Sequence, residues 1–286
     1  MSRDSRVTYL LAVGLCFLIV FQAVPAAAYQ TAEPPKNPQP GQRQHGGSAA
    51  AGEKCDPHFT YTPGPHDPSH WEGECNIGHM QSPIDITHAE KLRLSPLRFH
   101  YQPVDLKIFN DCNHYQVKVL FPNNSWLTVG KKSYSLTEFH FHEPAEHAVN
   151  GARAEVAIHL VHKSAESAVL VVEVPVIVGK ENPAIKTLWE HVPEKGTEHT
   201  FPGVKINAMD LLPSDRDFYH LSGSLTTPGC KQGVAWYVLK NPIEMSAAQV
   251  AEYQYHDTAR PLQPGNNRRI VEPLLKSPSS ANPAQR

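Results

Sequence analysis

The tetrapeptide Phe139-His140-Phe141-His142 is the part of the chain whose residue types and spacing are best suited to chemistry. On a β-strand alternate side chains share a face, so both imidazoles would point to one side and both phenyl rings to the other. Two imidazoles in front of an apolar backing form half of a metal site. The tetrapeptide alone is equally consistent with two surface histidines on a strand.

A third imidazole is provided by His159, in the middle of the apolar segment 157–161. A buried histidine without a partner is costly. Histidine is the commonest neutral metal ligand, and three histidines that leave a fourth position open are typical of catalytic rather than structural zinc. A structural site made of four cysteines is excluded, because no two cysteines are close together in the sequence.

The elements that must position these histidines are predicted to be strands. The chain has 26 prolines, 17 glycines and only 19% charged residues, a composition that indicates many turns and a sheet-rich fold. Runs of β-branched residues bounded by turn residues predict strands at Val117–Phe121, Val156–Val161, Val169–Val178 and Val234–Leu239. Helical signals are few, and they predict helices at Asn182–Glu190, beginning near Pro183, and at Ser246–Tyr255, with Ser246 as a cap.

The N-terminal segment has the layout of a signal peptide. Arg3 and Arg6 precede an apolar run from Val7 to Val24, and Pro25 and three alanines follow it, with Ala28 as the expected cleavage point. The alternative is an uncleaved membrane anchor, because the run is near the lower length limit of a membrane span. A periplasmic or secreted protein is therefore expected.

The remaining sequence is divided by composition. Residues 29–56 are rich in Pro, Gln and Gly and predict a disordered tether, residues 57–275 a single domain, and residues 276–286 a disordered tail. The net charge of −2 and the pI near 6.8 provide no basic surface for nucleic acid, so no nucleic-acid partner is expected. A small-molecule partner is the better default expectation.

Export would allow disulfides to persist, because the compartment is oxidising. Removal of the signal peptide leaves Cys55, Cys75, Cys112 and Cys230. Four cysteines allow three pairings, and the sequence arithmetic does not choose among them.

From about His58 to Arg268 the sequence resembles the α-class carbonic anhydrases, in the form of exported bacterial members. The resemblance depends on many short motifs in the family's order and at nearly its spacing. They are His58-Phe59-Thr60-Tyr61, His70-Trp71, Gln81-Ser82-Pro83-Ile84-Asp85-Ile86, Phe139-His140-Phe141-His142, Ala145-Glu146-His147, His159-Leu160-Val161-His162, Gly223-Ser224-Leu225-Thr226-Thr227-Pro228, Trp236 and Arg260-Pro261.

The resemblance implies one α+β, mainly β domain around a large, mostly antiparallel twisted sheet with few short helices. It implies that His140, His142 and His159 bind Zn²⁺ and that a zinc-bound hydroxide reversibly hydrates CO2 to bicarbonate and a proton. In the family a threonine accepts the hydroxide's hydrogen bond and donates its own to a glutamate. Here these residues are Thr226 and Glu146.

A pocket for CO2 should be apolar, because the substrate has no dipole and water there would compete. By position in the family, its apolar lining maps to Val161, Val171, Leu225, Val234 and Trp236. Thr227 and Gln116 map to the polar side of the substrate site, together with Thr226.

Two positions behind the ligands depart from the family's pattern. The family commonly has a glutamine two residues before the first histidine and a glutamate two residues before the third, where this chain has Glu138 and Ala157. Acceptors behind ligating imidazoles fix the ring orientation and tune the metal. Glu138 puts a negative charge behind His140, and Ala157 removes the usual acceptor for His159. We expect an altered zinc affinity or pH optimum rather than a loss of activity.

The proton shuttle is a further departure. Many members use a histidine near the mouth of the site, since its pKa is close to neutral. An ungapped alignment of residues 110–116 places Asn113 at that position, with His114 next to it. A shift of the loop could bring His114 into place, although adjacent residues on an alternating strand face opposite ways. His114 is the candidate shuttle.

The resemblance also implies partners and a cysteine pairing. Exported bacterial members join a cysteine before the Gln-Ser-Pro-Ile segment to one just after the Thr-Thr-Pro turn, here Cys75 and Cys230, and the pairing of Cys55 and Cys112 stays open. Sulfonamide or anion inhibitors are expected from the family, and a homodimer is one assembly that the domain could form.

Two other functional classes compete with the enzyme. A noncatalytic carbonic-anhydrase-like binding module typically lacks one of the zinc histidines, and all three are present here. A zinc-storage protein would cluster its histidines in flexible tracts rather than on apolar strands. The sequence therefore favours the enzyme.

Overall fold

The computed structural model describes Cys55 and residues 57–274. The predicted signal peptide, the tether apart from Cys55, and the tail 276–286 lie outside these residues. Within the described part of the chain, no helix has both the length and the apolar character to cross a membrane.

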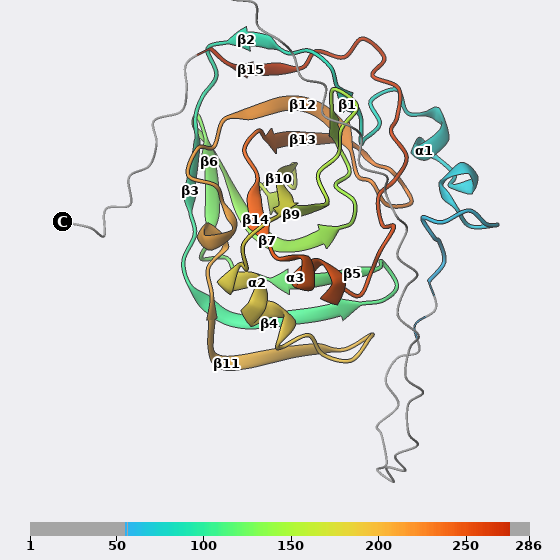
Figure 1. The fold of residues 1–286 in the computed structure, drawn as a ribbon. Helices are drawn as coiled ribbons and strands as arrows, with labels where there is room; N and C mark the ends of the chain where they lie inside the picture. Colours follow the sequence, from blue (N-terminus) through green and yellow to red (C-terminus); the bar gives the residue numbers. More distant parts are fainter. Residues whose placement is uncertain (1–54, 56, 275–286) are drawn as a thin grey trace, which may run out of the picture. The chain divides into compact units, whose positions relative to one another are not determined.

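Strands dominate the fold, and most of them belong to one large sheet of 13 strands (Figure 1). In spatial order its main path is β11 (Glu198–Ile206), β4 (Val104–Asp111), β5 (Gln116–Leu120), β7 (Lys132–His142), β9 (Val156–Lys163), β10 (Val169–Val178), β13 (Gln232–Leu239), β12 (Phe218–Ser224), β15 (Val271–Pro273) and β2 (Glu90–Leu92). Three further strands join this path: β3 (Leu97–His100), β6 (Trp126–Val129) and β14 (Ile243–Met245). A separate two-stranded sheet pairs β1 (Asp85–Ile86) with β8 (Ala148–Val149).

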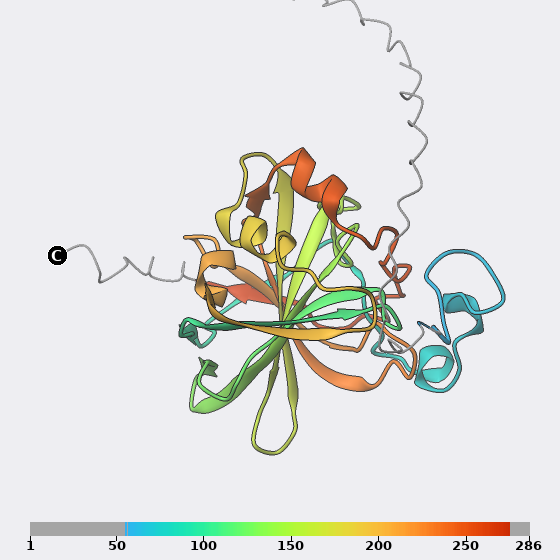
Figure 2. The same ribbon diagram turned by 90° about the horizontal axis from the view of Figure 1, so that it is seen from below.

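The large sheet confirms the expected mostly antiparallel architecture, with parallel pairs at three places. Strand β10 runs parallel to β13 and to β14, and β15 runs parallel to β2, so the sheet is mixed. Viewed at right angles to Figure 1, the strands fan out at different angles, which shows the twist (Figure 2).

The predicted strands correspond to β5, β9, β10 and β13. Strand β10 has the predicted bounds, and β5 is shifted by one residue toward the N-terminus. Strand β9 extends two residues further, to Lys163, and β13 begins two residues earlier, at Gln232.

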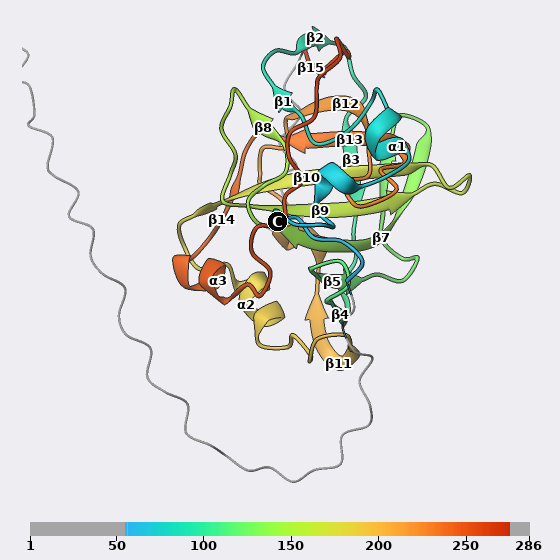
Figure 3. The same cartoon turned by 90° about the vertical axis from the view of Figure 1, so that its right-hand side faces the viewer.

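Both predicted helices form, and their caps explain where they begin. In α2 (Pro183–Trp189) the Asn182 side chain accepts hydrogen bonds from two N–H groups of the first turn, and in α3 (Ala247–Glu252) Ser246 forms a capping box. Helix α3 ends before the predicted Tyr255, because the backbone is already extended at Tyr253. The two helices lie side by side (Figure 3). The described residues also form the short helix α1 (Glu74–Ile77) and the 3₁₀ turns η1 (Pro68–His70) and η2 (Ala208–Leu211).

Two apolar clusters pack against the sheet near the histidines. The larger one contains Phe139 and Phe141, both fully buried. The smaller one surrounds Trp236 and Val171. The three histidines thus lie on strands whose other faces are held by buried apolar packing.

Candidate metal centre

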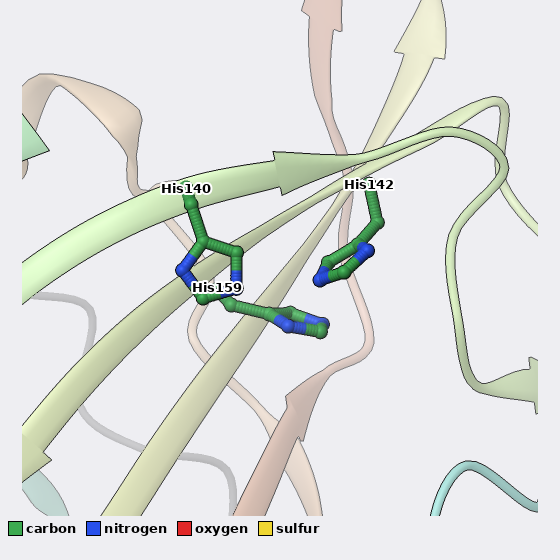
Figure 4. Close-up of side chains that lie close together, drawn as sticks. All are labelled: His140, His142 and His159. Carbon is green, nitrogen blue, oxygen red and sulfur yellow. The ribbon is translucent and has the colours of Figure 1, made fainter. Parts of the chain in front are cut away.

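Strands β7 and β9 bring the three histidines together. In their antiparallel register His140 is opposite His159, and His142 is two positions further along β7. Because side chains alternate on a strand, Phe139 and Phe141 pack into the larger apolar cluster while the imidazoles project to the opposite face, as the tetrapeptide predicts. Figure 4 shows the three rings converging.

The three imidazoles form a group that could hold a metal ion. One nitrogen from each ring lies within 4.8 Å of the others, and all three residues are buried. Burial lowers the pKa of His140, against the opposing charge of Glu138, and it lowers the pKa of His142 well below its ordinary value, with a further contribution from the neighbouring histidines. The His140 and His142 rings therefore favour the neutral form, which is the form that binds a metal.

Acceptors behind the rings of β7 decide which nitrogen faces the centre. Nδ1 of His140 lies 3.2 Å from Glu138 Oε1, and Nδ1 of His142 lies 2.8 Å from the carbonyl oxygen of Thr258. A carboxylate or carbonyl oxygen can only accept, so both Nδ1 atoms carry the proton. Nε2 of each ring is left as the electron-pair donor.

His159 is held in the opposite sense. Its Nε2 lies 3.1 Å from Glu173 Oε2 on β10, so its Nδ1 is left as the donor. The same oxygen of Glu173 lies 2.7 Å from Nδ1 of His147. Burial raises the pKa of the Glu173 carboxyl, but the charge and hydrogen bonds of His147 and His159 outweigh this effect and lower it. The resulting set of two Nε2 atoms and one Nδ1 atom suits a divalent metal that prefers nitrogen ligands.

Glu146 lies beside the donor nitrogens and is fully buried. Its Oε1 accepts the backbone N–H of Arg260 at 3.0 Å, and its Oε2 lies 3.8 Å from His142 Nε2 and 3.9 Å from His159 Nδ1. Burial raises the pKa of this carboxyl, and the charge of His159, the side chain of Thr226 and the bond from Arg260 oppose that rise. Thr226 is near enough to lower the pKa of this carboxyl, but Glu146 Oε2 has no hydrogen-bond partner among the described residues, so the pairing of Glu146 with Thr226 stays a prediction.

The five apolar residues expected around the substrate belong to one cluster. Val171, Val234 and Trp236 are buried in the smaller apolar cluster, and Val161 and Leu225 pack against it. The Trp236 ring lies 5.0 Å from the His159 ring between centroids, so the cluster adjoins the three histidines.

Comparison with known proteins places this geometry in a family. The model of the eukaryotic-type carbonic anhydrase family matches residues 66–275. The chain belongs to this family. Family membership supports reversible hydration of CO2 as the reaction and does not favour the noncatalytic alternative.

Several relatives are similar over most of the domain. A carbonic anhydrase of Klebsiella pneumoniae is 36% identical, over 75% of this chain and 91% of its own length. One of Nostoc sp. is 35% identical, over 72% and 83%. The structure of an α-carbonic anhydrase of Thermovibrio ammonificans, in complex with the inhibitor sulfanilamide, superimposes with a TM-score of 0.71 at 37% identity, covering 76% of this chain and 99% of that one.

The two departures from the family's pattern have different outcomes in this carbonic anhydrase. Glu138 does lie behind His140, as expected. At the other position Ala157 does not leave His159 without an acceptor, because Glu173 reaches it from β10. The altered zinc affinity and pH optimum stay predictions.

The polar residues expected at the substrate site lie in two places. Gln116 is buried, and its Nε2 lies 3.4 Å from His142 Nε2. Thr227 follows Thr226 in the turn after β12, where its carbonyl oxygen accepts the N–H of Cys230. Gly223, next to the last residue of β12, packs against the side chains of Ser82 and Trp236, and an added Cβ would collide with both.

His114 lies in the turn between β4 and β5 and is half exposed. Its Nδ1 lies 2.8 Å from Asp111 Oδ2, which also accepts from Lys118 Nζ at 2.6 Å. Its ring contacts that of Phe59. Among the described residues these contacts do not include the three histidines, so the structure does not by itself bring His114 to the metal centre.

Two disulfides connect the cysteines. Cys75 is joined to Cys230, the pairing that the resemblance implies, and Cys55 is joined to Cys112, which the sequence left open. The first bridge follows directly on the turn that bears Thr226.

The sequence analysis missed Glu173 and Thr258. A signal for Glu173 was present, because it is the sole charged residue within the apolar run Val169–Val178, and a buried carboxylate requires a partner. Thr258 acts through its backbone carbonyl, for which the residue type provides no signal.

Proposed function

We propose that His140, His142 and His159 bind Zn²⁺ through Nε2, Nε2 and Nδ1, and that this centre hydrates CO2. The observation that carries the proposal is the convergence of the three rings, each with its outer nitrogen held by Glu138, Thr258 or Glu173. Three neutral ligands leave a fourth position open, the arrangement of catalytic rather than structural zinc. Carbonic anhydrase is itself the standard example of zinc that acts as a Lewis acid and lowers the pKa of a bound water toward neutrality.

Thr226 and Glu146 orient the reacting oxygen. The Glu146 carboxylate can only accept hydrogen bonds, and its Oε2 has no other hydrogen-bond partner among the described residues, so the Thr226 hydroxyl would donate to that oxygen. The threonine oxygen is then available as an acceptor for the proton of the reacting water, which leaves a lone pair of that water free for the substrate. Because Glu146 is buried and fixed by the Arg260 N–H, this orientation costs little reorganisation during the reaction.

The apolar cluster of Val161, Val171, Leu225, Val234 and Trp236 would hold CO2 and exclude competing water. We place Gln116 and Thr227 on the polar side of the substrate. Gln116 is supported by its contact with the His142 ring and Thr227 by its adjacency to Thr226.

His114 is our candidate for the group that carries the product proton to bulk solvent. Its imidazole is half exposed, and Asp111 holds its Nδ1. Gln116, two residues later, contacts His142, so the turn that bears His114 leads directly into the wall of the site.

Export and inhibition belong to the same proposal. The two disulfides and the N-terminal signal pattern support an oxidising, exported location. The sulfanilamide complex of the Thermovibrio relative supports sulfonamide inhibition. The homodimer stays a prediction.

A metal-exchange experiment tests the function. The purified protein would be assayed for CO2 hydration before and after treatment with a chelator, and again after addition of one equivalent of Zn²⁺, with and without sulfanilamide. The proposal expects activity that is lost with the metal, restored by zinc and blocked by the sulfonamide. A zinc-loaded protein without hydration above the buffer rate would contradict it.

A further inference from the structure

Glu173 is a buried carboxylate in the middle of an apolar strand. It lies in β10 between Val172 and Val174, is 1% exposed, and belongs to neither apolar cluster. A buried charge is strongly destabilising unless it is paired and hydrogen-bonded. The reason for its presence must therefore lie in its contacts.

Both of its close partners are imidazoles, and both use the same oxygen. Oε2 lies 2.7 Å from Nδ1 of His147 and 3.1 Å from Nε2 of His159. Both nitrogens must donate to it, which fixes the tautomer of each ring. The rings are also confined from another side, because the Trp236 ring lies 4.7 Å from the His147 ring and 5.0 Å from the His159 ring.

Strand register puts Glu173 in this position. In the antiparallel pair of β9 and β10, Glu173 is directly opposite His159, and Pro175 is directly opposite Ala157. Residues 157 and 159 share a face, and a residue diagonal to Glu173 on that face is within side-chain reach. Position 157 is therefore the other place on this face from which a carboxylate could reach the His159 ring, and it is occupied by a fully buried alanine.

We propose that Glu173 is the positioning residue of the third metal ligand: it holds Nε2 of His159 from the facing strand, and His147 anchors it. The proposal rests on the metal site proposed above. His147 directly follows Glu146 in the sequence, so the same carboxylate connects the ligand strand β9 to the segment that orients the reacting oxygen. Glu173 acts through His159 and His147 and does not itself touch the substrate.

Zinc affinity measures this role without reference to catalysis. Loss of an acceptor behind a ligating histidine typically weakens metal binding by about 10- to 100-fold. A cavity of about 290 Å³ borders His147 and Glu173, so a truncated side chain there could be replaced by water. The first variant is therefore Glu173→Gln, which keeps the volume and removes the charge.

The experiment compares five proteins by competition for zinc with a chromophoric chelator and by the visible spectrum of the Co²⁺ form across pH. They are the parent, Glu173→Gln, Glu173→Ala, the swap Glu173→Ala with Ala157→Glu, and the control Glu244→Gln. Glu244 is an exposed carboxylate on β14, which pairs with β10 away from the histidines. The apo forms are compared by circular dichroism, to separate folding from binding.

We expect about 10- to 100-fold weaker zinc binding and a shifted cobalt spectrum for both single variants, and parent values for the control. The swap should recover most of the affinity, because the carboxylate again reaches His159. A purely structural role for Glu173 would not predict that recovery.

Parent-like zinc affinity and cobalt spectra in Glu173→Gln would overturn the proposal, as would a folded swap protein that binds zinc as weakly as Glu173→Ala. If Glu173→Ala does not fold, the zinc affinities of Glu173→Gln and of the swap protein still test the proposal. A parent that binds no zinc would instead refute the proposed metal site. A parent that binds zinc without hydrating CO2 would refute only the catalytic proposal, since the affinity comparison does not require turnover.

Discussion

The backbone N–H of Arg260 donates a hydrogen bond to Glu146 Oε1 at 3.0 Å, although the two residues are 114 positions apart. The Arg260 side chain is itself buried and donates to Gln81 Oε1 and to the carbonyl oxygen of Ser82, each at 2.8 Å. Arg260 therefore fixes the Glu146 carboxylate, and the distant segment of Gln81 and Ser82 in turn holds Arg260. The position of Glu146 relative to the histidines is thus set by hydrogen bonds between segments that are far apart in the sequence.

Replacement of Thr226 should separate orientation from metal binding. Thr226→Ala removes the hydroxyl that we propose links the reacting water to Glu146, so kcat/KM should fall by about 100-fold. The zinc content should stay unchanged, because Thr226 is not a ligand. Thr226→Ser keeps the hydroxyl and should recover most of the rate. Stopped-flow hydration with metal analysis checks this, and parent-like activity of the alanine variant would refute the role.

His114 should determine how hydration depends on buffer. If the half-exposed imidazole carries the product proton, the parent should hydrate CO2 rapidly even in dilute buffer. His114→Ala should then be slow in dilute buffer and return to the parent rate in concentrated buffer, which supplies another proton acceptor. Equal rates for the two proteins in dilute buffer would show that another group or the solvent carries the proton.

The two disulfides should have similar effects on stability and different effects on activity. They close loops with sequence separations of 155 and 57 residues, and loss of either should lower the free energy of unfolding by about 3 to 5 kcal/mol. Denaturant unfolding measures this. Only the Cys75→Ser/Cys230→Ser variant should also lose hydration activity when folded, because Cys230 supports the turn that bears Thr226. The Cys55→Ser/Cys112→Ser variant is the matched control.

His162 should make the apo protein less stable in acid. It is fully buried, its Nε2 lies 2.7 Å from the Tyr101 hydroxyl, and burial lowers its pKa to about 4. Between that pKa and the unfolded value of about 6.5, the unfolded chain binds a proton at His162 that the folded chain does not. The contribution of His162 to the free energy of unfolding is therefore fully present above about pH 6.5 and is lost as the pH falls toward 4. From pH 7 to pH 5 this loss should be about 2 kcal/mol.

Urea unfolding of the apo protein at both pH values, beside His162→Gln, checks this prediction. Other titrating groups are common to both proteins and cancel in the comparison. The variant should therefore lose about 2 kcal/mol less than the parent over this pH range. An equal loss in both would mean that His162 titrates normally in the folded state.

The two proposed ligands on β7 could be predicted because their signal is local. Strand alternation alone puts His140 and His142 on one face and Phe139 and Phe141 on the other. The sequence predicts the buried strand β10 with its observed bounds, because a continuous β-branched run is typical of a strand that is buried on both faces. Edge strand β11 was not predicted, since its mostly exposed residues show no apolar alternation.

The acceptors behind the proposed ligands could not be predicted, because strand pairing and long-range packing bring them next to the histidines. Nothing local indicates that Glu173 is opposite His159, or that the carbonyl of Thr258 faces His142. A single aligned position was misleading for the same reason: Ala157 suggested a missing acceptor, whereas the facing strand provides one.

The most direct test of the central claim is stopped-flow CO2 hydration by the zinc-loaded protein beside His159→Ala and His199→Ala, with zinc content measured for each. His199 is an exposed histidine on β11 and is the matched control. We predict rapid hydration with one zinc per chain for the parent and the control, and loss of both hydration and tight zinc binding in His159→Ala. Hydration that persists in His159→Ala, or a fully zinc-loaded parent that does not hydrate CO2, would contradict the account.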